Sequence, residues 1–140
     1  MSIYGFQGQY RFLSNFWPAK VHYEGMEYNS VEHAYQAAKT LDKETRLRIR
    51  DLRKPGEAKH EGNKVEMRAD WEEVKVDIMR FLVREKFSMN SKLKEQLLAT
   101  GDQYLEETNH WGDTFWGVCR GRGRNELGRI LMEVREELKR

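Results

Sequence analysis

The stretch from Ser30 to Lys39 brings together side chains of many different chemistries. At helical spacing its apolar residues fall on one side, namely Val31, Ala34, Ala38 and, just beyond, Leu41. The polar residues lie on the opposite side or flank it: Glu32, His33, Tyr35, Gln36 and Lys39. A carboxylate, an imidazole, a phenol, an amide and an amine thus share about two helical turns. A catalytic site needs such groups on one rigid element.

Glu32 allows two interpretations. Asn29 could cap this helix, and Glu32, three residues on, would then accept a hydrogen bond in a capping box. Alternatively, its carboxylate lines a cleft and acts as a general acid or base. The two roles are compatible, because a glutamate in the first helical turn is held rigidly.

Lys39 lies one turn beyond Gln36 on the same face. Most lysines on helices are simply solvated. A lysine that neighbouring aromatic rings partly desolvate loses its proton more easily, and its neutral amine can attack a sugar C1 or its ring-opened aldehyde. The spacing leaves covalent and electrostatic roles open for Lys39.

Short polar residues elsewhere could contact a ligand. His33 and Tyr35 are each either a core residue with a satisfied hydrogen bond or a substrate contact. Ser14 and Asn15 stand between aromatic residues in Phe12–Trp17, where they could make a turn or present polar groups beside a stacking surface.

A second polar cluster covers residues 106–113, after an expected strand. It is either an exposed loop or part of a site, since sites gather in loops at strand ends. In the functional interpretation, Trp111 and Trp116 stack on a flat heterocycle, and Glu107 or Asp113 binds ribose hydroxyls or orients water.

A third cluster, Cys119–Asn125, alternates arginine and glycine directly before the last expected helix. Backbone N–H groups, a helix N-terminus and the charges of three arginines, Arg120, Arg122 and Arg124, would together form a phosphate cradle. The alternative is a solvated basic turn in which Asn125 is the N-cap. The spacing matches neither a P-loop nor a GxGxxG fingerprint.

Composition and length set limits on the class of protein. The 140 residues suffice for one domain with a real core, which we expect over residues 1–140. The aromatic content of 11% argues against disorder despite a mean hydropathy of −0.88. A net charge of +2 is too small to indicate nucleic-acid binding by bulk electrostatics.

Several features point to a soluble cytoplasmic protein. Cys119 is the one cysteine, so no intramolecular disulfide can form. The N-terminus has no signal-peptide pattern, and no apolar run reaches membrane-spanning length, so we expect no membrane contact. The four histidines are scattered, and we expect neither a metal nor another cofactor. The oligomeric state stays open.

The pattern of elements predicts an α+β fold, with several helices packed on a small β-sheet. Residues 1–28 indicate short strands, including a hairpin of 21–23 and 26–28 around Glu24-Gly25. Helices follow over roughly 43–53 and from Pro55. Further strands are expected over 104–107 and 115–118.

Three later helices have apolar stripes. The helix over 70–87 begins with a capping-box pattern of Asp70 and Glu73, and its stripe comprises Trp71, Val74, Ile78, Phe81 and Leu82. Another helix carries Leu93, Leu97 and Leu98 and ends at Gly101. The last begins near Asn125 and directs inward Leu127, Ile130, Leu131, Val134 and Leu138.

Four blocks of this sequence resemble the YbiA-like, or NADAR, family of N-glycosidases. They are Phe12–Pro18, Glu32–Lys39 with the pattern E-H-x-Y-Q-A-x-K, Trp111-Gly112, and Gly123–Gly128 with the pattern G-x-N-x-L-G. The resemblance spans Phe12 to about Leu138. Family proteins often carry a glycine in the region of Asp113-Thr114, and this sequence has none there. The roles of Trp111 and Gly112 therefore carry over better than that of Asp113.

The resemblance implies an activity and roles for residues. The activity is hydrolysis of a bond between nitrogen and ribose C1, with Glu32 as acid/base and Lys39 as nucleophile or electrostatic stabiliser. The implied substrates are phosphoribosylated pyrimidine intermediates of riboflavin biosynthesis, or ADP-ribose on a nucleobase of a nucleic acid. From the residues and the resemblance together, the candidate substrate contacts are Ser14, Asn15, His33, Tyr35, Gln36, Glu107, Trp111, Gly112, Arg120, Arg124 and Asn125.

Two other classes of protein compete with the enzyme. A non-catalytic module that binds ADP-ribose or a nucleotide would keep the cradle and the tryptophans without needing Glu32 and Lys39. A structural or interaction domain would leave the polar helix face solvated. The presence of both Glu32 and Lys39 favours the enzyme.

Overall fold

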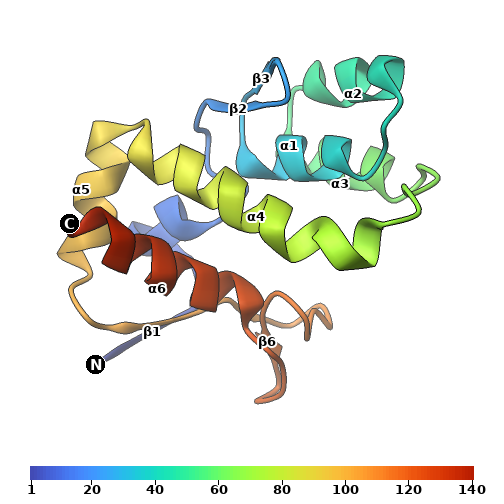
Figure 1. Cartoon of the computed structure of the whole chain (residues 1–140). Coiled ribbons are helices and arrows are strands. Elements are labelled where there is room, and N and C mark those ends of the chain that lie inside the picture. The colour runs from blue at the N-terminus through green and yellow to red at the C-terminus, as the bar shows by residue number, and fades with distance from the viewer. The chain divides into compact units, whose positions relative to one another are not determined.

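Two units make up the chain in the computed structural model, which describes all 140 residues. One unit comprises Met1–Ser14 together with Phe87–Arg140, and the other is Asn15–Lys86. Both contain helices and short strands, as Figure 1 shows, so the α+β class is confirmed. A single domain over 1–140 stays a prediction. No helix is both long and apolar enough to cross a membrane.

The unit Asn15–Lys86 consists mainly of helices. Its elements are β2 (Val21–Tyr23), β3 (Met26–Tyr28), α1 (Val31–Ala38), α2 (Lys43–Arg50), α3 (Pro55–Gly62) and α4 (Trp71–Ser88) up to Lys86. Helix α1 packs against both α2 and α3. As predicted, Pro55 opens α3, since proline suits the first helical position.

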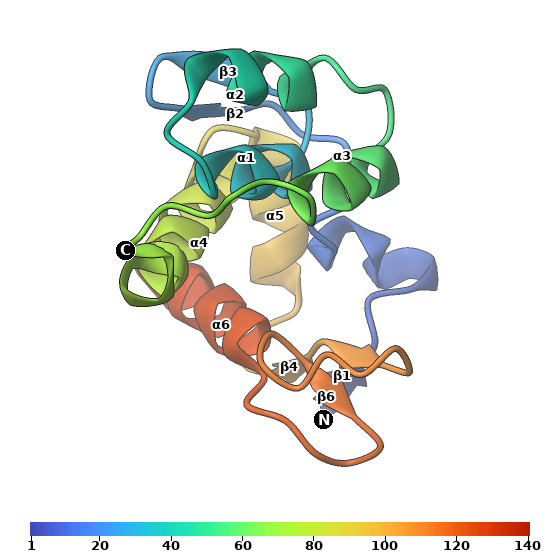
Figure 2. The same ribbon diagram turned by 90° about the vertical axis from the view of Figure 1, so that its right-hand side faces the viewer.

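The predicted hairpin is confirmed. Strands β2 and β3 are antiparallel, with Val21 opposite Tyr28 and Tyr23 opposite Met26. The connecting residues Glu24 and Gly25 both have positive φ, 45° and 86°, as a two-residue type I′ turn requires. The hairpin lies beside α2 in both ribbon views (Figures 1 and 2).

Helix α1 is buried on all sides rather than on one face. All eight of its residues are buried, so its polar side chains lie in the interior of the protein. The cap is Ser30, whose Oγ accepts from the His33 N–H at 3.1 Å, so the predicted cap at Asn29 is wrong by one residue. Leu41, expected on the apolar face, follows the end of the helix and is 68% exposed.

The predicted stripe of α4 is confirmed only in part. Trp71, Ile78 and Leu82 are buried, but Phe81 is exposed, and its ring lies 6.1 Å from that of Tyr23. The capping-box pattern of Asp70 and Glu73 stays a prediction. The Asp70 carboxylate accepts two hydrogen bonds from the Arg68 guanidinium, at 2.6 and 3.1 Å.

The other unit joins both ends of the chain. Its elements are β1 (Ser2–Tyr4), the 3₁₀ helix η1 (Gly8–Leu13), α5 (Ser91–Ala99), β4 (Tyr104–Glu106), β5 (Thr108–Asn109), β6 (Val118–Cys119) and α6 (Glu126–Leu138). Strand β1 pairs in parallel with β4, and β5 pairs in parallel with β6. The strands of the whole chain thus form three two-stranded sheets.

Two expected strands differ from the structure of this unit. Residues 8–13 form a 3₁₀ helix instead of extended chain. The strand expected over 115–118 begins only at Val118, because the residues before it turn around the side chain of Asp113, which accepts from the N–H groups of Phe115 and Trp116.

The core of this unit forms around α6. The inward positions expected for α6 are confirmed for Leu127, Ile130, Leu131 and Val134, which are at most 3% exposed, while Leu138 in the last turn is half-buried. The helix packs against β4 and α5.

Asn125 stands at the N-cap position of α6, but its side chain does not cap the helix. Its Oδ1 accepts from the Glu107 N–H at 2.9 Å, and its Nδ2 donates to the Leu105 carbonyl at 2.9 Å. Asn125 therefore fixes the chain after β4 to the start of α6. The alternative of an N-capping side chain is wrong.

Candidate active site

The candidate acid/base, Glu32, is buried and held at one oxygen. Gln36 Nε2 donates to Glu32 Oε2 at 2.6 Å, and the two residues are 3% and 7% exposed. The Glu32 N–H donates to the Asn15 carbonyl at 3.1 Å, which ties the turn at Asn15 to the start of α1. Because Ser30 is the cap, Glu32 is the second helical residue and not the third, so the capping-box role is wrong.

Lys39 is half-buried at the C-terminal end of α1. Its Nζ lies 5.8 Å from the centroid of the Tyr35 ring. Burial lowers the pKa of Lys39 below the ordinary lysine value; the charge of Glu32 opposes this shift, and Lys59 and Lys75 reinforce it. A lysine with a lowered pKa is neutral more often near pH 7, as nucleophilic attack requires.

An aromatic pair stands beside this lysine. The rings of Tyr35 and Trp71 are 5.2 Å apart, and both residues are at most 7% exposed. The apolar spacing placed Trp71 in the core of α4, and no pattern indicated that Lys59 and Lys75 act on Lys39. These two lysines belong to α3 and α4, so no local spacing could relate them to Lys39.

The backbone around Lys39 is held from two directions. The Arg68 N–H donates to the Lys39 carbonyl at 2.7 Å. Arg46, which is buried, donates from Nε to the Thr40 carbonyl at 2.8 Å and from Nη1 to Glu24 Oε1 at 2.7 Å. The end of α1 is thus fixed to the hairpin and to the segment before α4.

His33 uses both ring nitrogens within the protein. Nε2 lies 2.9 Å from the Leu52 carbonyl, to which it donates, and Nδ1 lies 2.7 Å from Ser30 Oγ. Burial lowers the pKa of His33. This is the arrangement of a hydrogen-bonded core residue, one of the two roles expected for it, and a contact with substrate stays a prediction.

The remaining expected site residues belong to the other unit. Ser14 ends η1, where its N–H donates to the Arg11 carbonyl at 2.9 Å. Glu107 accepts at Oε2 from Asn109 Nδ2 at 3.0 Å. Trp111 is 54% exposed and Gly112 is exposed.

Asn109 and Asp113 shape the loop that carries Trp111 and Gly112. Asn109 Oδ1 accepts from the Asp113 N–H at 3.0 Å, and its Nδ2 donates to the Asp113 carbonyl at 2.9 Å. The Asp113 carboxylate in turn accepts from two backbone N–H groups of the same loop. Asp113 therefore has a structural role, and local spacing did not indicate that Asn109 would shape this loop.

Gly117 is a further residue that sequence reasoning missed. A Cβ there would overlap the Glu107 carbonyl and lie 2.7 Å from Asn109 Nδ2. Only glycine allows β6 to follow so close to Glu107. A sequence signal existed, since Gly117 follows two aromatic residues directly before the strand.

The backbone N–H groups at the start of α6 are not available for the expected anion cradle, because carbonyls of the preceding loop accept from them. The N–H groups of residues 124–127 donate to the carbonyls of Thr114, Gly117, Phe115 and Trp116, respectively. Cys119 and Arg122 exchange N–H···O bonds of 2.8 and 3.1 Å around a tight turn. Figure 2 shows these loops near the start of α6, whose first N–H groups are therefore already occupied.

The arginine side chains of this segment remain as charged groups. Arg120 and Arg122 are exposed. Arg124 is paired with Glu126 Oε2 at 2.7 Å, and its guanidinium lies 4.9 Å from the centroid of the Phe115 ring. Any phosphate binding here would depend on these side chains.

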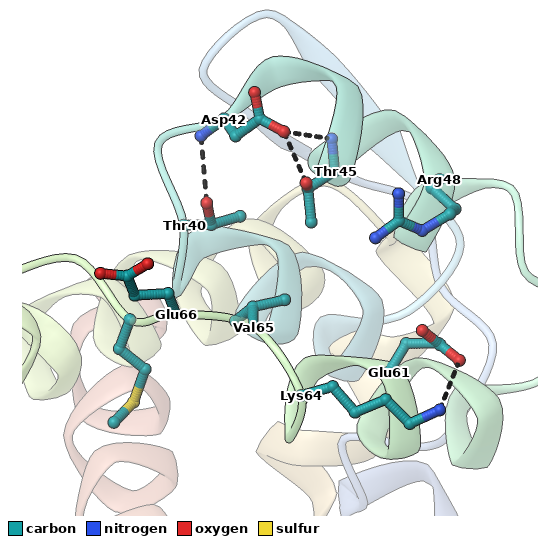
Figure 3. Close-up of a pocket in the computed structure, with 9 residues that line it drawn as sticks. Thr40, Asp42, Thr45, Arg48, Glu61, Lys64, Val65 and Glu66 are labelled. Carbon is teal, nitrogen blue, oxygen red and sulfur yellow. Dashed lines mark hydrogen bonds and ion pairs between the residues drawn. The ribbon is translucent and has the colours of Figure 1, made fainter.

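A polar pocket of about 440 Å³ opens between α2 and residues 61–67 (Figure 3). Thr40, the residue after Lys39, lines it, as do Asp42, Thr45, Arg48, Glu61, Lys64, Val65, Glu66 and Met67. Asp42 Oδ2 accepts from the Thr45 N–H and Oγ1, and Lys64 pairs with Glu61 at 3.4 Å. None of the expected site residues lines this pocket. No group of three or more His, Cys, Asp or Glu side chains is arranged to hold a metal ion.

Known proteins show what class of protein this chain is. It is 38% identical over 143 residues to N-glycosidase YbiA of Escherichia coli, covering 99% of this chain and 88% of that protein. It is 38% identical over 147 residues to an N-glycosidase of Nostoc punctiforme, covering 99% and 94%. The solution NMR structure of Escherichia coli YbiA superposes with a TM-score of 0.87 at 35% identity, covering 99% and 84%. The chain is an N-glycosidase, a hydrolase of N-glycosyl bonds.

The NADAR domain family model matches residues 4–139, and the chain belongs to this family. A riboflavin biosynthesis protein of Vibrio vulnificus is 48% identical over 131 residues. That alignment covers 91% of this chain but 35% of the Vibrio protein, so the chain spans about a third of that relative.

Proposed function

We propose that this N-glycosidase cleaves the bond between a ribose C1 and a nitrogen of phosphoribosylated pyrimidine intermediates of riboflavin biosynthesis. One observation carries the catalytic part of the proposal: Glu32 and Lys39 lie on one buried helix, the first held by Gln36 and the second with a lowered pKa. The names of relatives that belong to riboflavin biosynthesis support this substrate class.

Glu32 and Lys39 take different parts in the proposed reaction. Glu32 donates a proton to the leaving nitrogen as the C1–N bond breaks and its electron pair stays on nitrogen. Lys39 either adds to C1 of the ring-opened sugar as the base leaves or, when protonated, acts only through its charge. Water then adds at C1, and Glu32 as base takes up its proton. Where Lys39 had added, its bond to C1 breaks at this step and the lysine amine is released. The products are the free amine and ribose phosphate.

A second candidate substrate has the same bond, namely ADP-ribose on a nucleobase. The family resemblance supports it, and the exposed Trp111 offers a surface on which a flat base could stack. ADP-ribosylated nucleic acid would then be the partner. The proposed binding residues in the Ser14, Glu107–Gly112 and Arg120–Asn125 segments are the same for both candidates.

The substrate class can be tested by direct turnover. The purified protein is incubated with a phosphoribosylated riboflavin intermediate and, separately, with ADP-ribosylated DNA, and mass spectrometry follows released base, ribose phosphate and free ADP-ribose. We expect release from the riboflavin intermediate. Release from the DNA alone would favour the second candidate, and tight binding without release from either would favour the non-catalytic module.

We expect Arg120→Ala and Arg122→Ala to weaken binding of the phosphorylated substrate but not of its dephosphorylated nucleoside. A charge-assisted hydrogen bond contributes about 1.5–3 kcal/mol, which corresponds to roughly 10- to 150-fold in Kd. Arg124→Ala should have a smaller effect, because Arg124 already pairs with Glu126. Calorimetry on catalytically inactive protein measures both ligands, and Arg129→Ala, also exposed, is the control. Equal losses for both ligands would show that these arginines do not contact phosphate.

A further inference from the structure

Gly62, the last residue of α3, lies against the candidate catalytic helix. A Cβ at this position would lie 2.7 Å from Gln36 Cδ and 2.8 Å from Gln36 Cβ, and it would overlap Gln36 Oε1. Real Cβ atoms do not approach other heavy atoms this closely, so something would have to shift. The Gln36 Cβ is fixed to the α1 backbone, and a side chain on residue 62 would therefore displace the helix as well as the amide.

The nitrogen and the oxygen of the Gln36 side-chain amide have different surroundings. Its Nε2 donates to Glu32 Oε2 at 2.6 Å. Its Oε1 is buried and accepts no hydrogen bond. No second hydrogen bond therefore fixes this amide, and the contact with Gly62 sets how closely its carbonyl end can approach α3.

We propose that Gly62 and Gln36 are positioning residues that fix the orientation of the Glu32 carboxylate. This inference rests on the proposed catalytic role of Glu32. Gly62 leaves the space that the Gln36 amide occupies, and the amide holds one carboxylate oxygen of Glu32. A displacement of about 1 Å at a reacting group can lower a rate by roughly 10²-fold, so the space at residue 62 matters for turnover although Gly62 bears no reactive group.

Gly62→Ala tests this arrangement against a matched control in the same helix. We expect kcat to fall by roughly ten- to a hundredfold, because the reacting carboxylate is displaced. Gly56→Ala adds the same methyl group to α3 where no atom lies within 4 Å. It should leave kcat and KM unchanged. Wild-type kcat in Gly62→Ala would overturn the proposal.

A double-mutant cycle shows whether Gly62 acts through Gln36. Gln36→Gly removes the amide together with the Cβ, which are the atoms that a side chain on residue 62 would meet. Adding Gly62→Ala to Gln36→Gly should then lower kcat by less than about threefold further, far less than it does in the wild-type background. Independent, multiplicative losses would show that Gly62 supports the fold generally and would overturn the proposal.

Gln36→Met keeps the test valid if Gly62→Ala does not fold. Methionine retains an unbranched side chain against Gly62 but cannot donate to Glu32. We expect a folded protein whose kcat is at least about tenfold lower. An unchanged kcat would overturn the proposal.

A readout without turnover separates this inference from the proposed function. The side-chain amide protons of Gln36, observed by ¹⁵N NMR, should exchange slowly in the wild type and in Gly56→Ala and faster in Gly62→Ala. If Gly62→Ala leaves them slow, the positioning inference fails. If exchange behaves as expected but Glu32→Gln keeps wild-type turnover, the catalytic role of Glu32 fails instead.

Discussion

Replacing Glu32 by Gln should lower kcat by a factor on the order of 10² to 10⁴, the range typical of losing a general acid or base. Glutamine has nearly the same shape as glutamate but cannot carry a proton between the leaving nitrogen and water. The substitution places one neutral amide beside another, Gln36, so the packing of α1 is kept. Initial rates of base release over a range of substrate concentrations separate kcat from KM.

Glu44→Gln is the matched control for this experiment. Glu44 holds the same position in α2 that Glu32 holds in α1, the second helical residue after the cap, but it is exposed. A loss confined to Glu32→Gln shows that the buried carboxylate matters and not a charge at a helix N-terminus. Near-wild-type kcat in Glu32→Gln would contradict the catalytic role and leave the non-catalytic module as the better interpretation.

Borohydride added during turnover should trap a covalent intermediate between the substrate and Lys39. In a ring-opened substrate, C1 is doubly bonded to the nitrogen of the base. The neutral Lys39 amine adds to C1, and the base leaves with the electron pair of the C1–N bond and a proton. Borohydride reduces the resulting imine between Lys39 and C1 to a stable secondary amine. The adduct carries ribose phosphate without the base. Peptide mapping by mass spectrometry should place it on Lys39, and Lys39→Ala should lose both the adduct and most of the turnover.

The pH dependence of trapping follows from the environment of Lys39. Burial lowers the pKa of Lys39, which the charge of Glu32 partly restores. Since only the neutral amine attacks, trapping should increase as the pH rises through this pKa, and the rise should begin at lower pH than for an ordinary lysine. Trapping is therefore measured at several pH values with the reductant in excess.

Three other outcomes of the trapping experiment have distinct meanings. An adduct on Lys59 or Lys75, whose charges act on Lys39, would keep the chemistry but move the nucleophile. Robust turnover without any adduct would contradict covalent catalysis and favour a protonated Lys39 that stabilises the transition state. An adduct of equal yield in Glu32→Gln would show that the base departs without help from Glu32 and would contradict the part of Glu32 as the acid.

Local features of the sequence determined several elements of the structure. The pair Glu24-Gly25 determined the turn of the hairpin, where both residues have positive φ. Pro55 determined the start of α3, and the apolar spacing from Leu127 to Val134 determined the buried face of α6. The spacing of Glu32, Gln36 and Lys39 likewise placed them along one helix, and the hydrogen bond between Glu32 and Gln36 follows from their separation of four residues.

Contacts between residues far apart in the chain were decided by the tertiary structure alone. The 3.6-residue period predicts faces of a helix but not what covers them, so it could not show that α3 meets the polar side of α1 at Gly62 or that Phe81 is exposed. Glycines and arginines before α6 indicated a phosphate cradle, yet the carbonyls of residues 114–117 accept from the backbone N–H groups of residues 124–127. A backbone donor pairs with whichever acceptor the fold brings to it, and charge acts through space, as Lys59 and Lys75 act on Lys39. Both effects depend on distances that a one-dimensional pattern does not contain.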